Sequence, residues 1–236
     1  SQGMVSLQIE GRKDKIKIHG EREAAALDAR VAWDDKLLGE VANLVEYPKP
    51  MIGKFEDKFL ELPREVLLTS IQSHQKSFGV EDSDGNLKAY FLTTLNMEPP
   101  EPELVRKGWE KVLKARLEDA RFFFEADRKV GLNEWLEELE NVIFLAPLGS
   151  MGDKSRRIEV LCGKLADKLS ADKKSLATRA GRLAKTDLVS EMVNEFSDLQ
   201  GIMGGIYTKQ KGEDSEIGDA IYDHYLPTGP DSNIPG

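Results

Sequence analysis

The second half of the chain has a helical periodicity that constrains the fold more than any other feature of the sequence. From residue 103 to residue 225, apolar side chains recur at spacings of three and four residues. Such spacing is typical of amphipathic α-helices. It predicts helices over residues 103–128, 131–144, 151–169, 173–195, 198–208 and 214–225.

The first half of the chain predicts a mixture of helices and strands. Helical patterns occupy residues 5–30 and 34–46, and a further helix is expected after Pro63, because proline is tolerated in the first turn of a helix. Two strand-like runs, over 78–82 and 87–95, flank an Asp-Gly turn. This arrangement predicts a β-hairpin.

Three prolines between residues 99 and 102 interrupt the chain and predict a domain boundary. We expect a mixed α/β portion over residues 1–104, with the hairpin near 78–95, and a helical domain over 105–236. The mixed portion need not be a complete domain. The predicted fold class is therefore α+β, predominantly helical.

Composition excludes several classes of protein. Hydrophobic residues make up 40% of the 236 residues, which is enough for a core. The single cysteine, Cys162, excludes an internal disulfide framework, and three histidines leave few ways to build a histidine metal site. No apolar run approaches the roughly 18 residues of a membrane span, and no signal peptide is recognised. We expect a reduced, soluble, cytoplasmic protein.

Basic charge is concentrated in two windows, although the net charge is −9. On the predicted helix 151–169, four cations fall within an arc of roughly 80°, beside an apolar stripe formed by Ile158, Leu161, Leu165 and Leu169. The cations are Lys154, Arg157, Lys164 and Lys168, and weaker candidates in the window 105–130 are Lys111, Lys114 and Arg121. These side chains form either a phosphate-contacting ridge or an ordinary solvated surface.

Charged residues also fall on apolar helix faces. The predicted stripe of helix 103–128 consists of Val105, Trp109, Val112, Ala120 and Phe123. Arg116 lies within this stripe, and Asp119 is close enough to pair with it. Asp187 and Glu191 share the apolar face of helix 173–195. A structural charge network is expected for these four residues. The alternatives are that Arg116 contacts a nucleic acid or a second subunit, and that the two carboxylates hold a metal ion.

Five strings of residues, in order along the chain, carry a resemblance to a known family. They begin at Glu40, Leu62, Val112, Lys185 and His224. They read EVANLVEYP, LPREVL (with HQKSF after it), VLKARLEDARFF, KTDLVSEMV (continuing to LQGIMG) and HYLP. Over roughly residues 5–230 the chain resembles the bacterial glycyl-tRNA synthetase β subunit of the α2β2 type.

The resemblance implies an internal fragment of that subunit, with an HD-like helical domain over 105–236. It implies no catalytic residue, metal or cofactor here, because the aminoacylation site, with ATP, magnesium and glycine, belongs to the α subunit. The expected partners are that subunit and glycine tRNA, with no membrane. The basic side chains given above then become candidate tRNA contacts.

Two alternatives stay open beside this interpretation. One is a metal-dependent phosphohydrolase of the HD type that uses Asp187 and Glu191. Lys185-Thr186-Asp187 stands where such a protein has its His-Asp pair, and the missing histidine argues against it. The other alternative is a pure scaffold for the α subunit.

Overall fold

The computed structural model describes residues 5–230, 232 and 234–236, and the chain divides into two compact units after Arg121. The division falls inside one continuous helix, α4 (Pro102–Asp127). The sequence placed a boundary before this helix, whereas most of α4 belongs to the first unit. Both units are described separately below.

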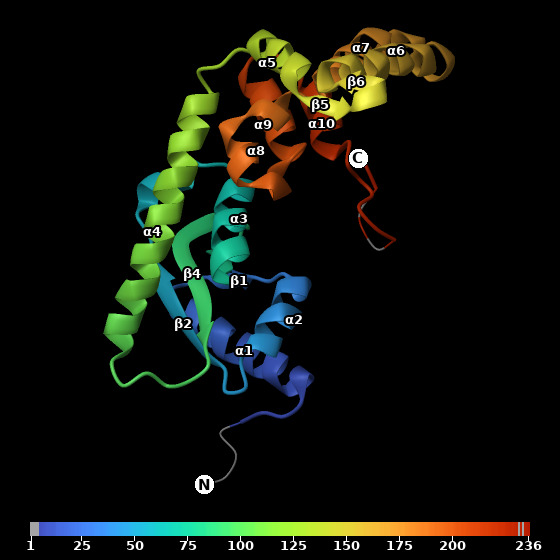
Figure 1. Cartoon of the computed structure of the whole chain (residues 1–236). Helices are drawn as coiled ribbons and strands as arrows, with labels where there is room; N and C mark the ends of the chain where they lie inside the picture. The colour runs from blue at the N-terminus through green and yellow to red at the C-terminus, as the bar shows by residue number, and fades with distance from the viewer. Residues whose placement is uncertain (1–4, 231, 233) are drawn as a thin grey trace. The chain divides into compact units, whose positions relative to one another are not determined.

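The first unit contains a four-stranded antiparallel sheet with the strand order β1-β3-β4-β2 (Figure 1). The strands are β1 (Arg30–Ala32), β2 (Lys49–Lys54), β3 (Phe78–Glu81) and β4 (Leu87–Leu95). The hairpin of β3 and β4 confirms the prediction, with Gly85 at a φ of 87° in its turn. Strands β1 and β2 were not predicted. Pro50 and Gly53 in β2 look like residues that interrupt secondary structure. Proline is nevertheless compatible with an edge strand, because the backbone N–H groups on the outer side of such a strand have no neighbouring strand to bond.

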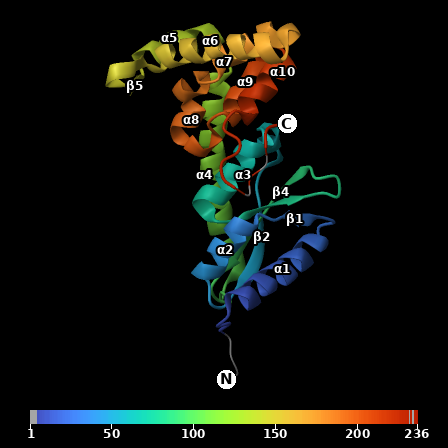
Figure 2. The same ribbon diagram turned by 90° about the vertical axis from the view of Figure 1, so that its right-hand side faces the viewer.

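Helices cover both faces of this sheet. They are α1 (Ile9–Ala25), α2 (Asp35–Leu44) and α3 (Arg64–Gln75), with a 3-10 turn η1 (Asp57–Glu61) before α3. Helices α1 and α2 lie on the same side of the sheet, around a core that includes Phe78 and Leu92 (Figures 1 and 2). Helix α3 approaches the other face, where a Cβ at Gly79 would lie 2.8 Å from Leu68 Cδ2. The glycine lets this helix pack closely.

Within the first unit, the buried stripe of α4 agrees with the predicted one only at Ala120. Its other buried side chains there are Leu113 and Leu117, whereas Val112 is 55% exposed. The predicted stripe is therefore wrong by about one position. It followed Trp109, whose side chain is only half-buried.

The second unit is almost entirely helical. Its helices are α5 (Leu132–Glu138), α6 (Met151–Leu169), α7 (Lys174–Leu183), α8 (Glu191–Glu195), α9 (Ile202–Gln210) and α10 (Ser215–Asp223). A short pair of strands, β5 (Ile143–Leu145) and β6 (Gly149–Ser150), precedes α6. The fully buried Trp135, Leu139 and Tyr207 lie in its core.

Two predicted helices of this unit are shorter than expected. The helix predicted over 131–144 ends at Glu138 and is followed by β5. The helix predicted over 173–195 is divided into α7, a 3-10 turn η5 (Thr186–Val189) and α8. The break has a local cause, because the Ser190 side chain accepts a hydrogen bond from Val193 N and starts a new helix. Among the described residues, none of the helices combines the length and apolar character that a bilayer crossing requires.

Candidate functional site

Helix α6, which carries the predicted basic ridge, begins with a well-formed cap. Ser150 and Asp153 form a capping box, in which each side chain accepts a hydrogen bond from the other's backbone N–H. Apart from Met151 in its first turn, the buried residues of α6 are small, among them Ser155, Gly163 and Ala166. Helix α6 packs against α7 on this buried side, and a Cβ at Gly181 would lie 2.9 Å from Cys162 Sγ.

Three of the four predicted ridge cations face solvent. Arg157, Lys164 and Lys168 are exposed, and Arg157 Nη1 donates a hydrogen bond to Leu148 O at 3.0 Å. Lys154 is half-buried, and its Nζ lies 3.9 Å from the centroid of the Phe144 ring. Lys154 therefore belongs to a different environment from the other three.

The apolar stripe that the sequence places beside this ridge is also mostly on the surface. Leu161 and Leu165 are each 57% exposed, and Leu169 is 80% exposed. Because the small residues of α6 occupy the interface with α7, its leucines remain outside the core. The exposed side of the helix thus carries cations and leucines together.

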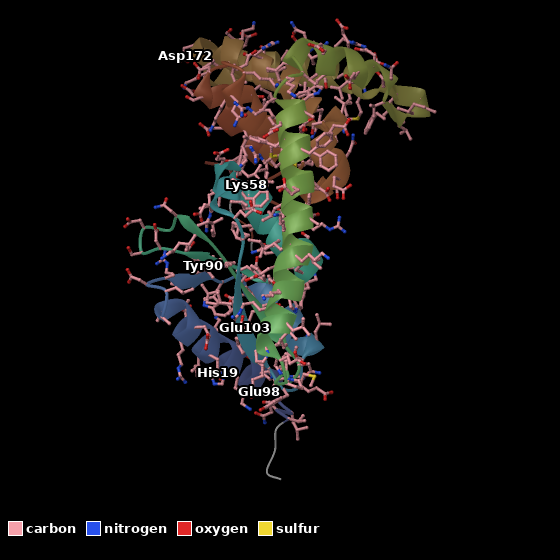
Figure 3. The ribbon with its side chains drawn as sticks, turned by 90° about the vertical axis from the view of Figure 1, so that its left-hand side faces the viewer. His19, Lys58, Tyr90, Glu98, Glu103 and Asp172 are labelled. Carbon is pink, nitrogen blue, oxygen red and sulfur yellow. The ribbon has the colours of Figure 1, made fainter. Side chains whose placement is uncertain are left out.

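The candidate cations of α4 border a groove of about 690 Å³ in the first unit. Lys111 and Lys114 line it, together with Lys107, Tyr90 and Phe55. Figure 3 shows Tyr90 and Lys58 beside α4. The remaining candidate, Arg121, is half-buried at the end of the first unit.

Ion pairs fix one end of this groove. Lys114 pairs with Glu56, and Lys58 Nζ lies 2.6 Å from Glu118 Oε1. The lysines Lys114 and Lys58 lower the pKa of the Glu56 carboxyl. Lys111 makes no ion pair with any residue of the described part of the chain. Lys111 is thus available to a ligand, whereas Lys114 already has a partner.

Asp187 is the most unusual carboxylate of the second unit. It is fully buried, and its Oδ2 accepts hydrogen bonds from Gly201 N at 2.5 Å and Gly204 N at 3.1 Å. Burial raises the pKa of Asp187 to about 6, against the opposing effect of these N–H donors. The carboxylate therefore caps the start of α9, where Gly201 adopts a φ of 84°.

A buried lysine lies close to this carboxylate. Lys185 Nζ is 2.6 Å from His224 Nε2 and 3.8 Å from the centroid of the Tyr225 ring. His224 Nδ1 lies 2.5 Å from Ile221 O, so Nδ1 donates there and Nε2 accepts from the ammonium group. Desolvation, with the charge of Lys154, lowers the pKa of Lys185 to about 8. Lys185 and His224 are therefore hydrogen-bonded to each other, whereas the buried Asp187 Oδ1 has no hydrogen-bond partner among the described residues.

Comparison with known proteins decides the family. A family described as "Glycyl-tRNA synthetase beta subunit" matches residues 1–236. The chain belongs to this family. It is 56% identical over 99% of its length to the glycine–tRNA ligase beta subunit of Nitratidesulfovibrio vulgaris strain DP4. It is 58% identical over 92% of its length to that of Oleidesulfovibrio alaskensis, and 52% identical over 99% to that of Lawsonia intracellularis. The chain spans about a third of the length of these curated relatives, with 34%, 31% and 34% covered.

In this member of the glycyl-tRNA synthetase β family, the two carboxylates of the predicted charge network lie in different helical segments. Asp187 belongs to η5, whereas Glu191 begins α8 and is exposed. The assignment of both carboxylates to one helix face is therefore wrong. Arg116 is half-buried and Asp119 is exposed, because the buried stripe of α4 lies one position further along.

One important residue was missed by the sequence reasoning. Asp127 is 1% exposed and accepts hydrogen bonds from Glu191 N at 2.9 Å, Met192 N at 3.0 Å and Tyr207 Oη at 2.8 Å. It caps α8 as Asp187 caps α9. The sequence did contain an indication of this role. The apolar stripe of α4 continues through Phe124 to position 127, so the Asp127 carboxylate lies on an apolar helix face.

Proposed function

We propose that this chain is a non-catalytic portion of the β subunit of glycine–tRNA ligase, which supports tRNA binding and assembly of an α2β2 enzyme. ATP, magnesium and glycine are then bound by the α subunit, and the chain acts in the cytoplasm. The observation that carries this proposal is the family match over residues 1–236 together with relatives that share more than half of the aligned residues.

The environments of the buried carboxylates support a non-catalytic role. Asp187 and Asp127 each accept backbone N–H groups at a helix start, which is a structural task. Among the described residues, no three His, Cys, Asp or Glu side chains are grouped as metal ligands would be. These observations do not favour the phosphohydrolase alternative. We also propose that the helical unit is an HD-like domain in which Lys185 and Asp187 occupy the former metal-binding region.

For tRNA contact, the groove beside α4 is the stronger of the two candidate surfaces. Lys107, Lys111 and Lys114 recur at spacings of four and three residues, so they follow one side of the helix. The half-buried Tyr90 adds aromatic surface to the groove, whose lining also includes the carboxylates of Glu56, Asp57 and Glu110. Lysines beside aromatic rings are suited to a nucleic-acid backbone and an unstacked base.

The test is a double substitution, Lys107→Ala with Lys111→Ala, in the full-length β subunit assembled with α. Each lost phosphate contact should reduce the slope of log K against log salt by about 0.7 to 0.9. The matched control is Lys15→Ala with Lys36→Ala, since both lysines are exposed and lie outside the groove. Equal tRNA affinity and salt dependence for both variants would show that the groove does not bind tRNA, and would favour the scaffold alternative.

A further inference from the structure

The exposed side of α6 presents an apolar row that the fold leaves uncovered. We define the α6 leucine face as Leu161, Leu165 and Leu169, with Phe144 and Leu148 at its N-terminal end. The three α6 leucines are 57%, 57% and 80% exposed. Spacing of four residues places them along one side of the helix over about 12 Å. A contiguous apolar row of this kind marks an interaction site on a folded protein.

The leucines cannot reach the core by rotation of the helix. Helix α6 meets α7 through glycines, and a Cβ at Gly163 would lie 3.1 Å from Thr178 Oγ1. A Cβ at Gly181 would lie 3.2 Å from Glu159 Cα. Turning the leucines inward would place larger side chains in this close contact. The outward direction of the leucines is therefore fixed by the packing of α6 on α7.

The same face continues onto the segment before α6. Lys154 Nζ lies over the Phe144 ring, and Arg157 Nη1 donates to Leu148 O. These contacts join Phe144, 38% exposed, and Leu148, 50% exposed, to the N-terminal end of the row. Figures 1 and 2 both show α6 at the outer edge of the helical unit, with α7 and α10 on one side.

Positive charge borders the face along one flank. Arg157, Lys164 and Lys168 are exposed there, and neither lysine has an ion pair within the described residues. The adjacent Asp167 is paired with Lys174 at 2.7 Å. A complementary partner therefore combines large apolar side chains with carboxylates along one edge.

We propose that the α6 leucine face docks an amphipathic helix of the enzyme's α subunit that carries leucine-type residues flanked by Asp or Glu. This inference rests on the proposed function. A helix fits because its anchors at i, i+4 and i+7 match a row of leucines spaced by four residues. RNA fits less well, because a phosphate backbone would pair with the three cations but leave the leucines against a polar strand.

The first test measures association of full-length β with α by sedimentation. Leu161→Asn with Leu165→Asn should raise the αβ dissociation constant at least tenfold. The matched control, Val160→Asn, changes a residue that is 54% exposed on the same helix, about 100° away from Leu161. It should stay within twofold of the wild type. Equal association of the double variant and the wild type overturns the inference while leaving the proposed function intact.

The second test reverses the charges beside the α6 leucine face and distinguishes a protein partner from an RNA partner. Lys164→Glu with Lys168→Glu should weaken αβ association, with a smaller difference at high salt, and should do so by a larger factor than it weakens the affinity of β for tRNA. Loss of tRNA affinity with normal αβ association would assign the face to RNA and overturn the inference. If wild-type β fails to associate with α, the proposed function itself fails.

Labelling identifies the occupant directly. In a Cys162→Ala background, Leu165→Cys should react with maleimide in β alone and be protected in the αβ complex, with the labelled peptide located by mass spectrometry. Protection in β alone would mean that another part of β, or a second copy of it, covers the face. That result, or full reactivity in the complex, overturns the inference.

Discussion

At the scale of single residues, two buried aspartates organise the helical unit. Asp127 holds the first N–H groups of α8 together with the Tyr207 hydroxyl, and Asp187 holds the first N–H groups of α9. Both were difficult to interpret from sequence, because a carboxylate on an apolar face is equally expected for an ion pair, a metal site or a cap. Only the backbone geometry distinguishes these roles, and it depends on segments that are 14 or more residues away.

Asp187 makes stability depend on pH in a defined direction. Its pKa rises from 3.8 to about 6 on folding, so the native state binds more protons than the unfolded state between these values. Its contribution to the free energy of unfolding is therefore largest below about pH 4 and falls as pH rises through 6. The free energy of unfolding of Asp187→Asn, taken relative to that of wild type, should therefore increase by about 3 kcal/mol as the pH rises from 4 to 7.

Urea unfolding of both proteins at several pH values measures this difference, since groups that do not interact with Asp187 contribute equally to both proteins. Asp198→Asn, at an exposed position, is the matched control for the removal of one carboxylate. A constant difference between Asp187→Asn and wild type, or one of opposite sign, would contradict the assigned protonation.

At the scale of elements, sequence periodicity predicted α4, α6 and the hairpin, but it did not predict which helix face is buried. In α6 the three leucines are exposed, since Gly163 and Ala166 are the buried residues of this part of the helix. Periodicity measures where large apolar residues lie, whereas close packing here depends on small ones. The same limitation applies to 173–195, where the cap at Ser190 ends a pattern that otherwise looks continuous.

The glycines of α4 and α7 give a test at this scale, because the same substitution has opposite expected effects. Gly108→Ala places a Cβ where nothing lies within 4 Å, so it should stabilise by about 0.5–1 kcal/mol through helix propensity. Gly181→Ala directs a Cβ at Cys162 Sγ and the Glu159 backbone, so it should destabilise by about 1–3 kcal/mol. Thermal and urea unfolding measure both, and stabilisation by Gly181→Ala would show that α6 and α7 pack less closely.

At the scale of the whole chain, the prolines between residues 99 and 102 mark the start of α4 but not the division between the two units. Leu113 and Leu117 are fully buried in the first unit, and Lys58 pairs with Glu118 there. Composition alone could not reveal this, because prolines occur both at the start of helices and in the segments that separate domains.

A pair of fragments tests whether α4 completes the first unit. The fragment 5–121 should unfold cooperatively in urea, because it retains Leu113, Leu117 and the pair of Lys58 with Glu118. The fragment 5–104 lacks these side chains and should lose at least 3 kcal/mol, from two buried leucines at about 1.5–3 kcal/mol each, or fail to fold. Leu113→Ala with Leu117→Ala in fragment 5–121 separates the loss of the core side chains from the loss of the helix backbone. If fragment 5–104 were as stable as 5–121, α4 would be an independent connector and the boundary would lie at the prolines.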